Sequence, residues 1–391
     1  MNIVHLIEYF SPALGYQETY LAKEQQRLGH HVTVVTSDRY FPFPDYDATV
    51  KKVLGNRIVG TGSFTEEGIH VIRKPILFEF FSRAWIVNLL PALRALKPDV
   101  IHIHSTSSLS TVRVARAKHT LKNIIVLVDD HSHLSVVANH WSKACFYWAF
   151  RTLFGRYLSH NINTFVAITK ETADIVRTYM GISEPIHVIE LGADTRLFSR
   201  SSKKRIELRK KYGWKEQNVA FIYTGKIIPD KGSDTLVDAC CALPGHTAKL
   251  LFVGSGPEMF IADLKKQLKQ AKKENDVVWV PMVKPIELPA YYSAADVGVW
   301  PKQESISMIE AAACSLPVIV KSSPSMQKRV RNENGVMYKE GNVQELTRAM
   351  QSMMKNKAVR ITMGKRGKQL VDQAYSWTSI AKQFLLLYTK T

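Results

Sequence analysis

The chain has 391 residues, of which 46% are hydrophobic and 10% aromatic, and this composition excludes an intrinsically disordered polypeptide. Lysine and arginine number 53 against 34 aspartates and glutamates. The resulting net charge of +19 favours polyanionic partners, namely nucleic acid, phosphorylated small molecules or an anionic membrane surface. A chain of this length exceeds one typical core, so we expect two domains.

The first half of the chain alternates short apolar runs with amphipathic segments. Predicted strands cover residues 2–10, 30–37, 99–104, 123–131, 164–169 and 186–191. Predicted helices include residues 17–29, 82–96 and 170–180. Runs rich in valine and isoleucine that alternate with helices are typical of a parallel sheet covered on both faces.

The alternation restarts after residues 199–218, which are polar and basic and carry no strand signal. Predicted strands then cover residues 219–225, 248–256, 276–283, 296–301 and 317–320. Predicted helices cover residues 233–243, 258–273 and 285–295, and the chain ends in an apolar helix over 375–391. The sequence therefore predicts two Rossmann-like α/β halves with a boundary near residues 195 to 215.

Ligands of open α/β sheets bind beyond the carboxyl ends of the strands, so the strand-to-helix loops hold the candidate site residues. Gly15 lies in the first such loop, where a glycine lets the backbone approach an anion at the next helix start, although an ordinary turn also explains it. Lys226 and Lys231 follow the first strand of the second half and suit a diphosphate, with two solvated lysines as the alternative. Gly254 and Gly256 would let the backbone approach a flat or phosphorylated group.

Two helix starts carry further expectations. The helix after Lys231 is predicted to take Ser233 or Asp234 as its N-cap. The helix in WPKQESISMIEAAACSLPVIV is predicted to begin near residue 308, with Ser307 as N-cap and Glu310 in the first turn. That pair would form a capping box, and Glu310 would also be placed to accept hydrogen bonds from ligand hydroxyls such as a ribose diol.

A cluster of acidic residues and histidines follows the strand at 123–131. Asp129, Asp130, His131 and His133 could orient a polar substrate or move protons there. The same pattern could form half of a metal site, but no further ligands are evident from the sequence. His102, on the strand VIHIHS, is better explained as a core histidine with its hydrogen bonds satisfied.

Other chemical motifs are weak. Asp45 and Asp47 form a D-x-D pair in a connector rich in proline and aromatic residues, where a solvated loop is the better explanation. None of the four cysteines belongs to a C-x-x-C pair, so we expect buried thiols in a reducing compartment.

The ordered set of motifs resembles the retaining glycosyltransferases of family 4, the glycosyl transferases group 1, over essentially the whole chain. The matching segments are YFSPALGYQETYLAKEQQRLGHHVTVVTS, PDVIHIH, VIELGADTRLF, YTGKIIPDKGSDTL, LLFVGSGPE, LPAYYSAADVGVWP and IEAAACSLPVI. Three departures stand out. Tyr16 follows Gly15 where the family usually has a second glycine, Lys226 replaces the usual arginine, and Glu304 lies closer than usual to Glu310.

The resemblance implies a GT-B fold, in which two Rossmann-like α/β domains face each other across a cleft. Residues 1–195 would bind the acceptor, residues 196–372 would bind the nucleotide-sugar donor, and the helix in 373–391 would cross back to the first domain. The implied catalytic residues are His131, Lys226 and Lys231, without a metal. Donor binding is implied for Gly15, Lys226, Lys231, Gly254, Gly256, Val283, Glu304, Ser305, Ile306, Ser307 and Glu310, and acceptor binding for Asp130 and His133.

The implied reaction moves a sugar from a nucleotide-diphosphate donor, UDP or GDP, to a glycan or lipid-linked glycan, with retention of configuration and no other cofactor. A GT-B-fold sugar-nucleotide epimerase and a non-catalytic sugar-nucleotide or polyanion-binding relative are the alternatives. Residues 140–160 mix aromatics with cations, which suits either an anionic membrane surface or an ordinary packed helix. No nucleic-acid motif is present. Without a signal peptide or a long apolar run, we expect a cytoplasmic protein, peripheral at most on the inner face of the membrane.

Overall fold

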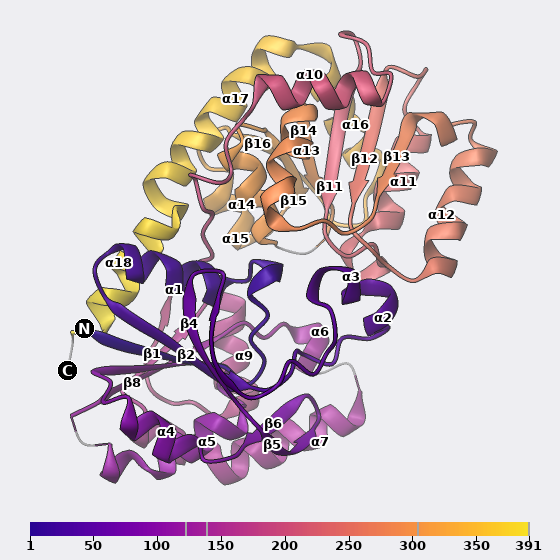
Figure 1. Ribbon diagram of the computed structural model, residues 1–391. Coiled ribbons are helices and arrows are strands. Elements are labelled where there is room, and N and C mark those ends of the chain that lie inside the picture. Colours follow the sequence, from indigo (N-terminus) through magenta and orange to yellow (C-terminus); the bar gives the residue numbers. More distant parts are fainter. Residues whose placement is uncertain (122, 138–139, 303–304, 390–391) are drawn as a thin grey trace. The chain divides into compact units, whose positions relative to one another are not determined.

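The computed structural model describes residues 1–121, 123–137, 140–302 and 305–389. The chain forms two compact units. Figure 1 draws the first in indigo to magenta with its C-terminal segment in yellow, and the second in rose to yellow. The first unit joins Met1–Leu191 to the C-terminal segment Trp377–Thr391, and the second is Gly192–Ser376. The sequence placed the two boundaries after residues 195 and 372, so each lies four residues from the one in the structure.

The first unit is built on an eight-stranded sheet in the order β10-β9-β8-β7-β1-β2-β4-β3. All of its strand pairs are parallel except β3 with β4. The strands are β1 (Asn2–Leu6), β2 (His31–Ser37), β3 (Gly62–Glu66), β4 (Ile69–Lys74), β7 (Val100–His104), β8 (Ile125–Asp130), β9 (Thr164–Ala167) and β10 (Ile186–Val188). The central strands are buried, as their apolar runs predict.

Helices cover both faces of this sheet (Figure 1). They are α1 (Gln17–Arg27), α2 (Tyr46–Thr49), α3 (Lys51–Leu54), α4 (Leu89–Ala95), α5 (Leu109–Arg116), α6 (Leu134–Val137), α7 (Trp141–Phe150), α8 (Arg156–Asn161), α9 (Lys170–Met180) and α18 (Trp377–Leu387).

The helix predicted over residues 82–96 is wrong in its first part. A separate hairpin of β5 (Ile76–Phe80) and β6 (Arg83–Ile86) occupies these residues, and α4 begins only at Leu89. Ala84 and Ile86 are buried while Arg83 and Trp85 are less so, which is the two-residue period of a strand.

The C-terminal helix α18 packs on α1 of the first unit. The rings of Tyr20 and Trp377 stack with their centroids 5.8 Å apart. Gln25 Nε2 donates to the Tyr388 hydroxyl over 3.0 Å. The apolar face of α18 therefore finds its cover on a helix more than 350 residues away in the sequence.

The second unit has a six-stranded parallel sheet in the order β13-β12-β11-β14-β15-β16. The strands are β11 (Val219–Thr224), β12 (Ala248–Val253), β13 (Val277–Val280), β14 (Val297–Trp300), β15 (Val318–Lys321) and β16 (Gly335–Tyr338). The helices are α10 (Ser202–Lys211), α11 (Ser233–Cys241), α12 (Glu258–Gln270), α13 (Leu288–Ala294), α14 (Ile306–Ala313), α15 (Pro324–Arg329), α16 (Val343–Lys355) and α17 (Lys357–Leu370). Because every pair is parallel, the loops after β11, β12, β13 and β14 emerge at one edge of this sheet.

No helix in the described ranges is long and apolar enough to cross a membrane. The four cysteines are free thiols. The predicted burial holds for Cys240 and Cys314, whereas Cys241 is only partly buried and Cys145 is exposed, so the prediction is wrong for Cys145.

Candidate functional site

Lys226 and Lys231 lie in the loop that follows β11. Lys231 ends a short 3-10 helix, η4 (Pro229–Lys231), and is partly buried. Burial and the nearby charge of Lys226 lower the pKa of Lys231 to about 8. Two ammonium groups that repel each other at the carboxyl end of a parallel strand would be stabilised by a bound anion.

The next helix, α11, starts at Ser233, as predicted, but its N-cap differs from the predicted one. Its N-cap is Gly232, not Ser233 or Asp234, and the amide of Leu236 closes the first turn on the Gly232 carbonyl over 3.0 Å. Gly232 has φ 76°, and a Cβ on it would lie 2.7 Å from the Cβ of Pro301. Glycine is thus required here by the left-handed backbone and by the neighbouring loop, which sequence preferences for polar N-caps do not register.

Gly254 and Gly256 let two loops of the second unit pack backbone to backbone. A Cβ on Gly254 would lie 1.9 Å from the carbonyl oxygen of Gly225, and one on Gly256 would lie 1.9 Å from that of Ile227. The Ile227 amide also donates to the Ser255 carbonyl over 2.9 Å. This packing alone accounts for both glycines. Val283, in the loop after β13, lies partly buried.

The helix α14 starts at Ile306, with Ser305 rather than Ser307 as its N-cap. The Ser307 amide donates to Ser305 Oγ over 3.3 Å. Glu310 therefore lies beyond the first turn, and the predicted capping box with Ser307 is wrong, since the cap sits two residues earlier. Glu304 lies outside the described residues.

Glu310 is a buried carboxyl group that is only 3% exposed. Among the residues that the structure describes, the side chain that hydrogen-bonds it is that of Tyr292 in α13, whose hydroxyl lies 3.4 Å from Glu310 Oε2. Burial raises the pKa of Glu310 to about 8, and the hydrogen bond from Tyr292 offsets only part of this. The Tyr292 hydroxyl also forms a hydrogen bond with Thr224 Oγ1 of β11 over 2.8 Å. The sequence did not predict this residue as part of the site, because its position in the helix is typical of an apolar packing residue.

In the first unit, Gly15 follows a 3-10 turn, η1 (Pro12–Leu14), and has φ 65° and ψ 44°. Its amide donates to the Pro12 carbonyl over 3.1 Å, and α1 begins two residues later with Tyr16 as N-cap. The left-handed conformation explains why a glycine stands at this position.

Asp129, at the end of β8, is the centre of a buried polar cluster. His104 Nδ1 lies 2.9 Å from Asp129 Oδ1, and Gln17 Nε2 donates to Oδ2 over 2.8 Å. His131 Nε2 lies 3.4 Å from Oδ2, without the alignment of a full hydrogen bond. Burial alone would raise the pKa of Asp129, but the surrounding histidines outweigh it and hold that pKa well below its usual value.

The carboxylate of Asp129 stabilises the protonated form of His131. Burial opposes protonation, but Asp129 more than compensates and raises the pKa of His131 to about 9. His131 remains partly exposed, unlike Asp129. A cationic imidazole at the carboxyl end of a parallel strand can bind an anionic or hydroxylated ligand.

Asp130 and His133, the two residues predicted to bind the sugar acceptor, differ in their surroundings. Asp130 is buried, and backbone amides occupy both of its oxygens, that of Thr106 on Oδ2 and that of Ser132 on Oδ1, each over 2.9 Å. This carboxylate holds the loop after β8 in shape. His133 lies partly exposed in the same loop.

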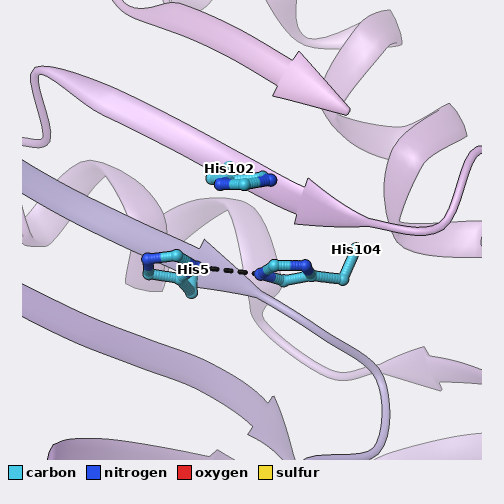
Figure 2. A group of neighbouring side chains, drawn as sticks. All are labelled: His5, His102 and His104. Carbon is cyan, nitrogen blue, oxygen red and sulfur yellow. Dashed lines mark hydrogen bonds between the residues drawn. The ribbon is translucent and has the colours of Figure 1, made fainter. Parts of the chain in front are cut away.

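Two further histidines lie beside the cluster that the sequence predicted around Asp129 and His131. His5 and His102 lie beside His104, all three buried (Figure 2). Only the fold brings β1, β7 and β8 side by side, so residue spacing could not reveal the group. In the D-x-D pair, by contrast, Asp47 is exposed and pairs with Lys51 over 2.7 Å, as expected of a solvated loop.

Two sequence families match the chain. Residues 19–197 match Glycosyltransferase Family 4, and residues 204–370 match Glycosyl transferases group 1. The chain is 27% identical over 214 residues to a GDP-mannose-dependent alpha-(1-6)-phosphatidylinositol monomannoside mannosyltransferase of Mycobacterium tuberculosis, a match that covers 51% of this chain and 55% of that protein. The chain thus spans about half the length of that relative.

Other matches extend over nearly the whole chain. It is 24% identical over 378 residues to alpha-monoglucosyldiacylglycerol synthase of Acholeplasma laidlawii, covering 93% of this chain and 89% of that protein. The crystal structure of Anabaena HepE in complex with UDP superposes with a TM-score of 0.75 at 17% identity and covers 99% of both chains. The likeness of these folds confirms the predicted GT-B class with two Rossmann-like α/β units.

Proposed function

The chain belongs to the family 4 glycosyltransferases, the glycosyl transferases group 1, and we propose that it transfers a hexose from a nucleotide-diphosphate sugar to an acceptor with retention of configuration. The second unit binds the donor in this proposal, and the first unit binds the acceptor. The observation that carries the proposal is the lysine pair in the loop after β11, where burial and the nearby charge of Lys226 lower the pKa of Lys231 to about 8.

Lys226 and Lys231 hold the donor diphosphate in this proposal. As the bond between the sugar and the diphosphate breaks, negative charge grows on the leaving nucleotide, and two ammonium groups at its phosphates stabilise that charge. No metal ion is required for this step, because the lysines supply the positive charge. The Lys226 ammonium acts as a point charge and lacks the paired hydrogen bonds that an arginine would make.

Glu310 binds the ribose hydroxyls of the donor nucleotide. A carboxylate accepts hydrogen bonds from both hydroxyls of a diol, and these bonds favour its charged form. Donor binding would thus replace the proton that burial keeps on Glu310 with two hydrogen bonds. Ser305, Ile306 and Ser307, at the start of α14, place their backbone beside the same ligand.

The donor nucleotide is UDP or GDP in this proposal. HepE was crystallised with UDP, and the M. tuberculosis relative is named for GDP-mannose. Four further residues contribute backbone or packing surface to donor binding: Gly15, Gly254, Gly256 and Val283. His131 contacts the transferred sugar as a cation, and His133 contacts the acceptor beside Asp130, which shapes their loop.

The acceptor is a glycan or a lipid-linked glycan, reached at an anionic membrane surface. Trp141 and Trp148 of α7 are 73% and 71% exposed, and Leu77 of β5 is 70% exposed. The β5–β6 hairpin packs against α7, since Arg83 lies 4.1 Å over the ring of Phe146. Exposed tryptophans next to basic residues are typical of a surface that inserts into the headgroup region.

A vesicle assay tests this membrane contact. Wild-type protein should sediment with phosphatidylglycerol vesicles and much less with phosphatidylcholine vesicles. Replacing Trp141 and Trp148 by serine should abolish sedimentation. The matched change Met259→Ser, at an exposed apolar residue of the second unit, should leave it intact. Equal sedimentation of all three proteins would remove the membrane contact from the proposal.

A turnover assay tests the reaction itself. UDP- and GDP-hexoses are incubated with and without glycan and glycolipid acceptors, and the anomeric proton of the product is read by NMR. We expect a product with the anomeric configuration of the donor, formed only when an acceptor is present. An isomerised donor without transfer would establish an epimerase instead.

A further inference from the structure

The strand β16 is the last strand at one edge of the second unit's sheet (Figure 1). It pairs with β15 on one side, and no strand in the described ranges pairs with its other side. Such an edge presents backbone N–H and C=O groups that can pair with another chain. No role assigned above uses this edge.

Hydrogen bonding to the β15 side shows which backbone groups of β16 face outward. The amide of Ser322, which follows β15, donates to the Tyr338 carbonyl over 2.7 Å, so residue 338 faces β15. Successive residues of a strand turn their backbone groups to opposite sides. Gly335 and Met337 therefore point their N–H and C=O groups away from β15, and these four groups can pair with one additional strand.

The edge is closed just beyond this point. The Lys339 amide, at the next outward position, donates to Glu345 Oε2 of α16 over 2.8 Å. The structure shows no such side-chain bond to the Gly335 or Met337 backbone in the described ranges, and Met337 is 39% exposed. The open part of the edge is thus confined to these two residues.

A groove of about 600 Å³ lies beside Gly335 and Met337. Its other wall is the helix α17, from which Ala358, Val359 and Met363 line the groove. These residues recur at the spacing of one helix face. Val359 is 42% exposed, so this largely apolar face is turned to solvent and not to the core. An apolar groove beside an open strand edge is typical of an interaction site.

The segment that forms both walls is strongly basic. Residues 321–368 contain 12 lysines and arginines against three glutamates, which gives a net charge of +9 out of the +19 of the whole chain. Arg331 and Arg366 line the groove itself, where Arg366 forms an ion pair with Glu333. A concentration of positive charge around the groove favours an acidic occupant.

Charge and shape together select among the possible occupants. A second copy of the chain would bring two sets of like charge together, which is unfavourable. A nucleic acid would match the charge, but its phosphates would gain nothing from the apolar wall. An extended peptide matches every feature, because its main chain pairs with an open edge while alternate side chains enter the groove.

We propose that the groove between β16 and α17 binds an extended acidic segment of a partner protein, which adds a strand to the sheet of the second unit. The backbone of Gly335 and Met337 holds the main chain of this segment. Every second side chain of the segment is apolar and contacts Val359 and Met363, and acidic side chains meet the arginines. The inference does not rest on sugar transfer.

Fluorescence anisotropy of labelled peptides with the full chain tests the binding. The probes are octapeptides in which valine or leucine alternates with glutamate or aspartate, and we expect at least one of them to bind saturably. Peptides with lysine in place of the acidic residues should not bind. Peptides with glycine in place of the apolar residues should bind at least about tenfold more weakly, since they bury no apolar side chain. No binding by any acidic peptide, or equal binding by the glycine peptides, would overturn the inference.

Two variants of α17 separate the groove from general electrostatic attraction. Val359→Glu puts a negative charge into the groove and should weaken binding of the acidic peptide at least about tenfold. Ile361→Glu is the matched control, because Ile361 is 49% exposed on the same helix but does not line the groove. The two variants have the same net charge. Equal peptide affinity in the two would contradict the proposed site.

Amide hydrogen exchange tests the added strand. In the free chain the Met337 amide should exchange faster than that of Tyr338, which faces β15, and the bound peptide should protect it. Met337→Pro removes this outward N–H without breaking a bond to β15, so it should weaken peptide binding. Unchanged exchange at Met337 with saturating peptide would overturn the inference. So would a dimer of the free chain in sedimentation velocity that Val359→Glu abolishes, because a second copy would then occupy the groove.

Discussion

Replacing Glu310 by glutamine should stabilise the second unit, and increasingly so as the pH rises. Burial raises the pKa of this carboxyl from 4.5 to about 8 in the folded protein. The folded state thus holds a proton that the unfolded chain loses near pH 4.5. The contribution of this proton to stability is complete below pH 4.5, declines as the pH rises, and is lost above about pH 8. Glutamine carries no such proton.

The magnitude follows from the width of this window. A difference of 3.5 pKa units corresponds to about 5 kcal/mol of unfolding free energy across the whole window. At pH 7, about 3 kcal/mol has been lost by the wild type and not by Glu310→Gln. Any packing cost of the amide does not depend on pH, so it shifts the comparison between the two proteins without changing its slope.

Urea unfolding at pH 5, 6, 7 and 8 measures this slope in the transition of the second unit. We expect the stability of Glu310→Gln relative to wild type to rise by about 1 kcal/mol per pH unit. Glu274→Gln, at an exposed glutamate of the same unit, is the control and should show no such rise. Parallel stability curves for wild type and Glu310→Gln would refute the buried, protonated carboxyl.

The same substitution should weaken donor binding. A carboxylate that accepts ribose hydroxyls is worth about 1.5–3 kcal/mol, so Glu310→Gln should bind UDP or GDP about 10- to 100-fold more weakly. A variant that is more stable and yet binds more weakly would be the signature of a functional carboxylate. Unchanged nucleotide affinity would remove Glu310 from the donor site and leave the stability result standing.

Three further outcomes follow from the geometry. Donor affinity should fall above about pH 8 as Lys231 loses its proton, and Lys231→Ala should abolish this pH dependence, as binding isotherms at pH 6.5 to 9 would show. Asp129→Asn should lower the pKa of His131 below 6.5, because the burial that opposes its charge stays while the carboxylate is lost; NMR titration measures this. Gly254→Ala should cost several kcal/mol or prevent folding, whereas Gly245→Ala, where a Cβ meets nothing within 4 Å, should cost about 1 kcal/mol by urea unfolding.

The strands at the centre of each sheet were predictable because burial on both faces demands continuous apolar runs. Such runs mark β1, β7 and β8 of the first unit and β11 and β12 of the second. The strands β3 to β6 were not predicted, since β3 is the edge strand, β4 lies next to it, and β5 and β6 form a separate hairpin. Each of them includes residues that are exposed or only partly buried. Burial on one face leaves a weaker signal.

Helix starts were misplaced where several residues can cap. Ser305 and Ser307 are both competent N-caps, and the choice of Ser305 moves Glu310 out of the first turn. At α11 the conformation of Gly232, forced by the nearby loop, decided the cap. Local preferences rank such positions, but contacts between loops select among them.

The candidate sites were predictable only in part. Lys226, Lys231 and His131 stand in loops that any parallel α/β sheet brings to its carboxyl edge, so their placement followed from the strand pattern. The partners that set their charge did not. Tyr292 reaches Glu310 from another helix, and Tyr388 reaches the histidines from the end of the chain.

Binding of a nucleoside diphosphate to the lysine pair is the most direct test of the proposed function. Calorimetric titration of UDP and of GDP at pH 7, without added metal, should show one equivalent bound to the wild type by at least one of them. Lys231→Ala should bind that nucleotide about 100-fold more weakly, as expected for the loss of a partly buried charge at a phosphate. Equal affinity in the two proteins, or no binding of either nucleotide to the wild type, would contradict the assignment of the donor site.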